Sequence, residues 1–326
     1  MNMFNRKKRG VIDNFTLIVI TVLVSFVILF IFVYNAFASV DTDFDACHLS
    51  IQERSTYNLG PFEPAREYVP LNCRTQKLCL QANKREGCET SGIVSTKDNA
   101  VKKIEISAKP QKIKGDILSE ISDSMYRCHS MMGEGKLNFM PTGNYDNNYC
   151  VVCTKFGVDD KLKSEVLAPV ITQRDLYNYL AEREDNQDVS YLKRIYGVDS
   201  VKDIELYINE AGTKADSSNS FDFKLLDDYT IDLNKGSYSI IVQMQKKGDG
   251  WVTAGSFVLG GVVLIAFPYL GIAGITTSAL IGSGAGFMSF YYFDNTEEFV
   301  YGAPTIVPYD ADTLKALKCT DLEGAP

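Results

Sequence analysis

Two long runs without charge frame this chain, and the body between them has apolar and polar positions at regular spacing. The first run extends over Asn14–Val40 and the second over Gly250–Phe293. We therefore expect five segments: a basic tail (1–14), an apolar anchor (15–39), a folded body (40–249), a Gly-rich apolar hairpin (250–293) and a C-terminal tail (294–326).

The first apolar run predicts a transmembrane anchor. Phe15–Ala38 is dominated by Ile, Val, Leu and Phe, and at about 1.5 Å of rise per residue it is long enough to cross a hydrocarbon core of roughly 30 Å. Basic residues precede the run and acids follow it: Arg6, Lys7, Lys8 and Arg9 before, Asp41, Asp43 and Asp45 after. The positive-inside rule then places the N-terminus in the cytoplasm, the anchor in the cell membrane, and the body on the extracytoplasmic side.

Two processing signals leave alternatives open at this anchor. Ala36-Phe37-Ala38 has the small residues of a signal-peptidase site, although the apolar run exceeds the roughly 7–15 residues of a cleaved signal. The stretch Arg6–Ile12 resembles a pilin-type signal, with a basic patch and Gly10 directly before the apolar helix. We expect a retained anchor, with pilin-type processing and secretion as alternatives.

The second apolar run predicts two helices joined by a tight turn. It is about twice as long as one membrane span, and Pro268 and Gly271 interrupt it near the middle. We expect helices over 251–267 and 272–292, in a transmembrane or re-entrant hairpin. Small residues recur at every fourth position, as in close helix contacts in membranes: Gly274, Ser278, Gly282 and Gly286 in the second helix, and Ser256 and Gly260 in the first.

This stripe of small residues is compatible with three roles. Packing within the hairpin or against the anchor is the primary interpretation. Self-association into a ring or pore uses the same stripe. A Gly-rich apolar segment that inserts into another membrane, as fusion peptides do, is the third.

The cysteine count supports a hairpin rather than a single crossing. With a hairpin, the tail around Leu314–Cys319 returns to the outer side, and all eight cysteines share one compartment. Disulfides persist outside the cytoplasm, so we expect every cysteine to form a structural disulfide and the tail to be bonded to the body. These residues are Cys47, Cys73, Cys79, Cys88, Cys128, Cys150, Cys153 and Cys319.

The body is predicted to be an α+β domain stapled by these disulfides. Apolar residues three and four apart predict a helix over 112–132, and shorter helices are expected over 172–184 and 189–196. Strands are expected over 149–156, 201–208, 221–225, 229–233 and 238–245, with Asn234-Lys235-Gly236 as a hairpin turn. Residues 41–95 are expected to be rich in loops, and Ser217–Ser220 a surface loop.

Cys150-Val151-Val152-Cys153 has the spacing of a redox motif. Val-Val favours a strand, however, on which thiols three positions apart point to opposite faces and are poorly placed for a mutual bond. Together with Cys128 and His129, these cysteines also have tolerable spacing for a zinc site. We place both interpretations below structural disulfides to other cysteines, because an extracytoplasmic location favours oxidised cysteines.

Two further patterns are weaker. Asp41-x-Asp43-x-Asp45 opens like a calcium loop, but Ala46 and Gln52 stand where an EF-hand needs Gly and a carboxylate. Gly133-Glu134-Gly135-Lys136 lacks the length and the Ser/Thr of a phosphate loop, so it is expected to be the turn that ends the preceding helix. The acids of Glu182–Asp185 are expected to be a solvated helix face.

Composition narrows the function classes. Apolar residues make up 45% of the chain and charged residues 23%, which predicts a folded core. Lys+Arg 33 against Asp+Glu 41 gives a net charge of −8, which argues against nucleic acid as a partner. The sequence contains two histidines and no fingerprint for a cofactor or a catalytic triad.

Several segments resemble cysteine-rich, membrane-anchored envelope proteins of small symbiotic (DPANN-type) archaea. The segments are Met125–His129 followed by Met132–Lys136, then Tyr149–Cys153, and Val307-Pro308-Tyr309 through Leu314 to Cys319. Members of that family often have Trp where His129 stands. The resemblance implies an archaeal envelope setting and supplies no catalytic residues.

We therefore expect a non-enzymatic structural or interaction protein at the cell surface, within an envelope assembly. Its expected partners are membrane lipid and envelope proteins, including further copies of the chain, and no cofactor is expected. A pore or fusion module built on the Gly-rich hairpin is the first alternative. A thiol-disulfide oxidoreductase or zinc-dependent enzyme using Cys150 and Cys153 is the second.

Overall fold

The structure is a computed structural model of the 326-residue chain, and it divides into two compact units, Met1–Asp45 and Ala46–Pro326. The residues that it describes are 19–29, 42–56, 69–81, 88, 93, 101–106, 109–140, 148–159, 162, 170–206, 230–234, 236–246, 257–259, 262–267, 275–282, 288–294, 299–317 and 319–323.

In the first unit, residues 19–29 form a helix. Its large apolar side chains are exposed, from 39% for Val19 to 69% for Phe26. The rest of the predicted anchor, including both processing signals, lies outside the described residues. Within the described part of the chain, every helix is too short or too polar to reach across a bilayer.

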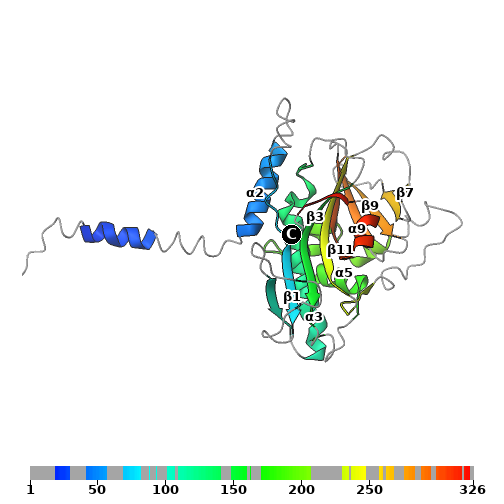
Figure 1. Cartoon of the computed structure of the whole chain (residues 1–326), viewed down its shortest axis with the longest axis horizontal. Helices are drawn as coiled ribbons and strands as arrows, with labels where there is room; N and C mark the ends of the chain where they lie inside the picture. The colour runs from blue at the N-terminus through cyan, green and yellow to red at the C-terminus, as the bar shows by residue number, and fades with distance from the viewer. Residues whose placement is uncertain are drawn as a thin grey trace, which may run out of the picture. The chain divides into compact units, whose positions relative to one another are not determined.

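A mixed ten-stranded sheet forms the centre of the second unit (Figure 1). Its strand order is β2-β1-β3-β6-β11-β10-β9-β8-β7, and β12 pairs with β3 as well. The pairs β1–β2, β1–β3 and β12–β3 are parallel, and the other pairs are antiparallel. The strands are β1 (Gln76–Gln81), β2 (Val101–Glu105), β3 (Asn148–Val158), β6 (Tyr238–Lys246), β7 (Phe257–Leu259), β8 (Val262–Phe267), β9 (Ile275–Gly282), β10 (Met288–Asp294), β11 (Phe299–Pro308) and β12 (Cys319–Glu323).

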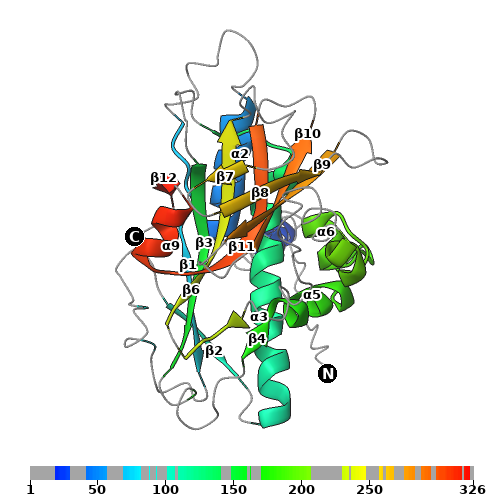
Figure 2. The same ribbon diagram turned by 90° about the vertical axis from the view of Figure 1, so that its right-hand side faces the viewer.

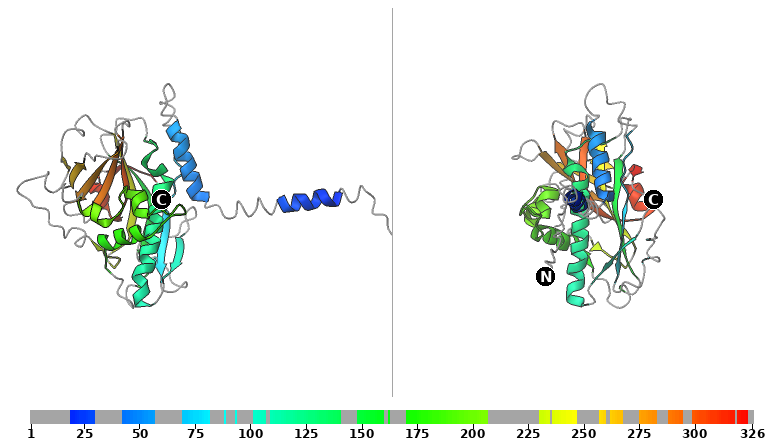
Figure 3. Two further views of the ribbon diagram at one scale, coloured as in Figure 1. Left: turned by 180° about the vertical axis from the view of Figure 1, so that it is seen from behind. Right: turned by 90° about the vertical axis from the view of Figure 1, so that its left-hand side faces the viewer.

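Helices cover both sides of this sheet. Helix α3 (Pro110–Met131) contacts β3, β6 and β11, while α5 (Gln173–Glu182) and α6 (Tyr191–Tyr196) pack against α3. Figures 2 and 3 show α9 (Ala311–Ala316) on the opposite side of the sheet from α5 and α6. The prediction of a mixed α+β domain is therefore confirmed.

The sequence of α3 explains both its start and its buried face. Pro110 lies in the first turn, where a missing backbone N–H costs nothing. Ile113, Ile117 and Ile121 recur every fourth residue and are at most 2% exposed, so they lie on one face in the core. The predicted helix over 112–132 is confirmed to within two residues at its start.

Other predicted elements of the body are confirmed in part. Strands 149–156 and 238–245 appear as β3 and β6, and helices 172–184 and 189–196 appear in shortened form as α5 and α6. The predicted strand over 221–225 and the loop Ser217–Ser220 lie outside the described residues.

Residues 201–206 form a helix, so the predicted strand over 201–208 is wrong there. The backbone N–H of Ser200 donates to the Asp203 carboxylate at 2.8 Å, and so does its hydroxyl. A Ser followed three residues later by an acid is a helix-start signal, and the apolar alternation of Ile204, Leu206 and Ile208 in the sequence concealed it.

The predicted hairpin around Asn234 is also wrong. Strand β5 (Thr230–Ile231) pairs with β4 (Ile171–Thr172) in a separate two-stranded sheet, whereas β6 lies in the main sheet. The Tyr238 hydroxyl accepts from the N–H of Asp232 and donates to its carbonyl, at 2.8 and 3.2 Å. A side chain therefore engages the backbone groups that a hairpin ladder would have used.

The largest correction concerns 250–293, where two helices were expected. The described residues of this segment form strands β7 to β10 as an antiparallel series. Ser278 and Gly282 lie in β9, while Gly274, Gly286, Ser256 and Gly260 lie outside the described residues. Positions four apart share a face in a strand as well as in a helix, so the spacing of the small residues did not discriminate between the two.

The C-terminal tail returns to the body, as expected. Strand β12 pairs with the first part of β3, with Cys319 opposite Asn148 and Leu322 opposite Cys150. Strand β1 pairs with the second part of β3, from Thr154 onward. The two parallel neighbours thus lie along successive parts of the same strand.

Candidate functional site

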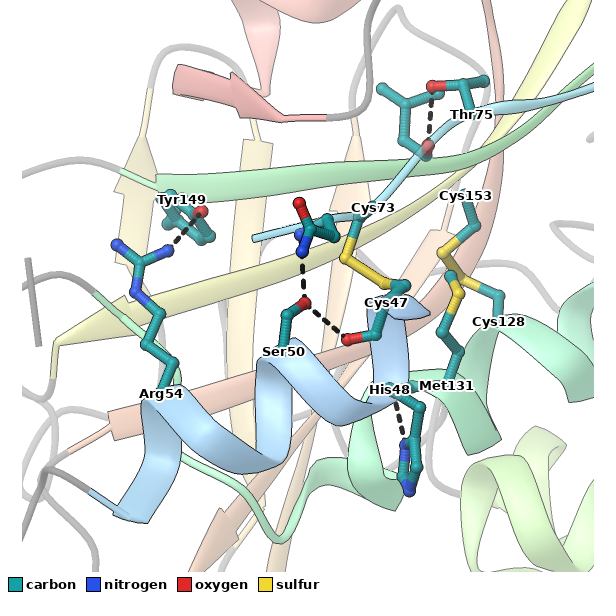
Figure 4. Close-up of a disulfide and its surroundings, with 12 residues drawn as sticks. Cys47, His48, Ser50, Arg54, Cys73, Thr75, Cys128, Met131, Tyr149 and Cys153 are labelled. Carbon is teal, nitrogen blue, oxygen red and sulfur yellow. Dashed lines mark hydrogen bonds between the residues drawn. A yellow bond between two sulfur atoms is a disulfide. The ribbon is translucent and has the colours of Figure 1, made fainter. Parts of the chain in front are cut away.

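Helix α2 (Thr42–Thr56) lies in the region that was expected to be loops, and its residues from Ala46 onward are bonded to other parts of the second unit (Figure 4). Cys47 forms a disulfide with Cys73, which precedes β1. One turn later, the Ser50 hydroxyl donates to the Cys47 carbonyl at 2.7 Å and accepts from the N–H of Asn72 at 3.0 Å. The helix is therefore held to the segment leading into β1 by a covalent bond and by hydrogen bonds.

Two other side chains fix α2 to α3 and β3. His48 Nδ1 donates to the carbonyl of Met131, the last residue of α3, at 2.9 Å. Arg54 donates from Nη1 to the Tyr149 hydroxyl at 3.4 Å, and its guanidinium lies 5.9 Å from the centroid of that ring. Arg54 is 5% exposed, so this contact fixes the last turn of α2 against β3.

A second disulfide joins α3 to β3. Cys128 is bonded to Cys153, and the β3–β6 register shifts between Val152 and Thr154. Cys153 is thus the extra residue of a β-bulge, a feature that redirects a side chain out of the regular alternation. The expectation that Cys153 bonds to a distant cysteine is confirmed.

The redox interpretation of Cys150 and Cys153 is not supported by this pairing. Cys150 is fully buried and disulfide-bonded, and the partner of Cys153 is Cys128. Neither cysteine is a free thiol, so the motif does not present the reactive thiolate that a thiol oxidoreductase requires.

The third disulfide, Cys79–Cys88, links β1 to the segment after it. These two residues pack with Ile93 and Val101 in a small apolar cluster. Six of the predicted disulfide residues are thereby confirmed in three bonds, which join residues 9 to 26 positions apart in the chain.

The zinc alternative for Cys128, His129, Cys150 and Cys153 is not supported, because Cys128 and Cys153 are bonded to each other. His129 turns into the core instead, where it is 3% exposed and its Nδ1 lies 3.3 Å from the Tyr301 hydroxyl. Among the described residues, no group of three or more His, Cys, Asp or Glu side chains is placed to hold a metal ion.

Burial controls the protonation of the His129–Tyr301 pair. Loss of solvent lowers the pKa of His129 to about 4, partly opposed by the negative charge of Glu134. Burial likewise raises the pKa of Tyr301 well above its ordinary value. Both groups are therefore neutral at physiological pH, and they share a hydrogen bond between the tyrosine hydroxyl and Nδ1 of the imidazole.

The turn after α3 covers this pair. Gly133, Glu134 and Gly135 have φ values of 69°, 56° and 73°, three successive residues in the left-handed region. A Cβ on Gly135 would lie 2.7 Å from Cδ1 of Tyr301, so only glycine allows this approach. The hydrogen bond from Lys136 lowers the pKa of the Glu134 carboxyl. The predicted turn at the end of the helix is confirmed.

Among the acids of Glu182–Asp185, Glu182 and Glu184 are exposed as expected, but Asp185 is not part of a solvated helix face. Helix α5 ends at Glu182, and the Asp185 side chain is 3% exposed. Its Oδ1 accepts from the N–H groups of Gln187 and Val189, and its Oδ2 accepts from Arg194 Nε at 2.7 Å. Asp185 therefore organises the loop between α5 and α6.

The acids after the predicted anchor also have a local role that the sequence did not indicate. Asp43 and Asp45 lie in the first turn of α2, where negative charge is favourable near the positive end of the helix dipole. Asp41 lies outside the described residues.

Sequence reasoning missed the contact residues of α2. Cys47, Ser50 and Arg54 are buried at spacings of three and four, which is a helical pattern. The prolines after residue 60 led to a prediction of loops for the whole of 41–95, although these prolines lie beyond the end of the helix. Together these contacts form a junction at α2, which fixes this helix to α3, to β3 and to the segment that leads into β1.

Comparisons with known proteins found no match: no family model, curated protein or solved structure is similar to this chain.

Proposed function

We propose that this protein is a membrane-anchored structural or interaction protein of the cell envelope, which presents its disulfide-bonded α+β domain outside the cytoplasm. The observation that carries the proposal is the junction at α2. The helix begins only a few residues after the apolar segment 15–39, and Cys47–Cys73 with Arg54 fixes it to the domain. These contacts make α2, the first described helix after the apolar segment, an integral part of the domain that the proposed anchor carries.

The exposed helix 19–29 supports the anchor in this proposal. Its side chains include Ile20, Leu23 and Phe26, which are 53%, 60% and 69% exposed. A continuous apolar surface of this kind is unfavourable in water and favourable in a lipid bilayer. Segment length, the basic residues before it and the acids after it argue for the same arrangement.

The disulfides support the extracytoplasmic side. Bonds between Cys47 and Cys73, Cys79 and Cys88, and Cys128 and Cys153 are stable in an oxidising compartment and rare in a reducing cytoplasm. The proposed partners are lipid and other envelope proteins, including copies of this chain. The net charge of −8 disfavours nucleic acid.

Membrane extraction tests the anchor directly. We expect the full chain to stay in the membrane pellet after an alkaline carbonate wash. The double variant Val22→Arg/Phe26→Arg, with two charges on adjacent helical turns, is expected in the soluble fraction, because each arginine at the centre of a span costs about 2.5–3.5 kcal/mol. Leu206→Arg changes an exposed apolar residue of the other unit, 58% exposed, and serves as the matched control that stays in the pellet.

Release of the unmodified chain by carbonate would contradict the anchor, as would retention of the double arginine variant. Protease added outside intact cells tests the orientation. The folded domain should be cleaved there without lysis, and protection of the domain would place it in the cytoplasm.

A further inference from the structure

Two fully buried polar side chains lie next to each other at the carboxyl ends of the parallel strands β1 and β3. Gln81 is the last residue of β1 and Asp159 is the first residue after β3, and both are 0% exposed. Leu80 pairs with Val158, and the N–H of Asp159 donates to the Leu80 carbonyl at 3.0 Å. The next residues along both strands, Gln81 and Asp159, therefore share one face of the sheet.

The polar atoms of this pair are incompletely satisfied. Asp159 Oδ1 accepts from the N–H of Leu162 at 2.7 Å. Asp159 Oδ2 and both amide atoms of Gln81 have no hydrogen-bond partner within the described part of the chain. A buried polar atom without a partner costs about 1–3 kcal/mol, and more for a charged group. Such groups in folded proteins have a specific cause, such as local strain, a catalytic role, or a bound water molecule or ion.

The chemistry of the pair favours a cation over water alone. Water supplies a hydrogen bond to Asp159 but does not neutralise a buried carboxylate. On the adjacent strand, Glu105 of β2 pairs in register with Gln81, at the exposed edge. Glu105, Gln81 and Asp159 thus occupy neighbouring positions across the ends of three adjacent strands. Hard oxygen donors of both kinds suit Ca²⁺, which tolerates irregular geometry better than Mg²⁺ does.

We propose that Asp159 Oδ2 and Gln81 Oε1 bind a calcium ion, with Glu105 at the open side of the site. This set holds a single buried carboxylate and an amide, so it differs from clusters of acids, histidines and cysteines. The small number of carboxylates predicts a dissociation constant of about 0.1–1 mM, the range of extracellular calcium modules. The inference depends on the second unit alone and is independent of the membrane anchor.

Thermal unfolding of the purified full chain in detergent, after removal of metal with EDTA, tests the site. We expect Tm to rise by several degrees on addition of about 10 mM CaCl2, because the ion binds the folded state only. An equal concentration of MgCl2 should have a much smaller effect. Asp159→Asn keeps an acceptor for the Leu162 N–H, since Asn also caps helix starts well, and should abolish the calcium-induced shift.

Asp185→Asn is the matched control. Asp185 is also largely shielded from solvent, but Gln187, Val189 and Arg194 engage its oxygens, so its variant should retain the calcium-induced shift. If Asp159→Asn does not fold, Gln81→Met should lower the calcium affinity at least about fivefold, because it removes the amide oxygen at similar volume. An unchanged Tm in calcium, an equal effect of magnesium, or an unaltered shift in the Asp159 or Gln81 variant would overturn the proposal.

Discussion

His129 and His48 are the two histidines of the chain, and their surroundings give them different roles. His48 is half-buried on α2 and donates to the Met131 carbonyl, while its second nitrogen lies 2.8 Å from Gln52. His129, near the end of α3, is buried against Tyr301 and has a pKa of about 4. The same side chain is therefore a surface hydrogen-bonding group in one place and a neutral core residue in the other.

The low pKa of His129 predicts acid sensitivity. Its pKa is about 4 in the folded chain against an ordinary value of 6.5, so the unfolded state takes up a proton first as the pH falls. Above pH 6.5, His129 is neutral in both the folded and the unfolded chain, so its titration costs no stability. As the pH falls from 6.5 toward 4, only the unfolded chain gains the proton, and the free energy of unfolding decreases. Between about pH 7.5 and 4.5 we expect a loss of about 2–3 kcal/mol in the free energy of unfolding, measured with urea.

The variant His129→Asn should lack this component, while His48→Asn should retain it. Carboxylates also titrate in this range, so the comparison is between the two variants and the unmodified chain at each pH. An identical pH dependence for His129→Asn and the unmodified chain would show that His129 is not responsible.

At the scale of elements, the end of α3 depends on glycine. Gly135 has a φ of 73° and approaches the ring of Tyr301, whereas a Cβ at Gly115, inside α3, would meet nothing within 4 Å. The two glycines therefore differ in what a methyl group would do. Position 135 requires the absence of a side chain, whereas position 115 has room for one.

Substituting each glycine by alanine should have opposite effects. We expect Gly135→Ala to lower the free energy of unfolding by about 2 kcal/mol or more, from the left-handed backbone and the crowding at Tyr301. Gly115→Ala should raise it by about 0.5–1 kcal/mol, because alanine loses less backbone entropy in a helix. Chemical denaturation measures both, and a neutral Gly135→Ala would contradict the close approach.

Two bulges adapt the central strands to their neighbours. The bulge in β3 places Cys153 for its bond to α3, and the register shift in β11 between Gly302 and Thr305 accommodates Pro304. Proline cannot donate to a ladder, so a bulge is where a central strand can accept it. The Pro304 carbonyl instead accepts from the Tyr196 hydroxyl at 3.1 Å, which links β11 to α6.

At the scale of the whole molecule, disulfide bonds connect segments that are far apart in the chain. Three disulfides use six of the eight cysteines, and Cys150 is also disulfide-bonded. Cys319 is the one cysteine that remains, and its strand β12 runs along the part of β3 that contains Cys150. We therefore expect a fourth bond, Cys150–Cys319, that holds the C-terminal tail to the centre of the sheet.

Peptide mapping without reduction should recover a linked peptide pair containing Cys150 and Cys319. Thiol titration in denaturant should count no free thiol in the unmodified chain and one in Cys319→Ser, where Cys150 loses its partner. A free Cys319 in the unmodified chain, or a bond from Cys150 to any other cysteine, would contradict this connectivity.

Local patterns in the sequence were enough for a large part of this fold. The repeat of Ile113, Ile117 and Ile121 predicted α3, and the valines of the Cys150–Cys153 stretch predicted β3. The helix spacing of Cys47, Ser50 and Arg54 was present in the sequence but was not used, and the stripe at 250–293 misled because strands and helices both align every fourth residue. Elements whose residue spacing fits only a helix or only a strand were thus predictable, and elements whose spacing fits both were not.

By itself, the sequence determined the properties that depend on composition and on near neighbours: the apolar segment and its flanking charges, the α+β class, the length of α3 and the oxidised state expected of the cysteines. The tertiary structure alone decided which cysteines pair, that His129 is enclosed by Tyr301, and that Gln81 stands beside Asp159. The physical reason is the distance along the chain between the residues that interact. Periodicity and helix signals act over a few residues, whereas burial, strand order and disulfide partners depend on segments that are far apart in the chain and meet only after folding.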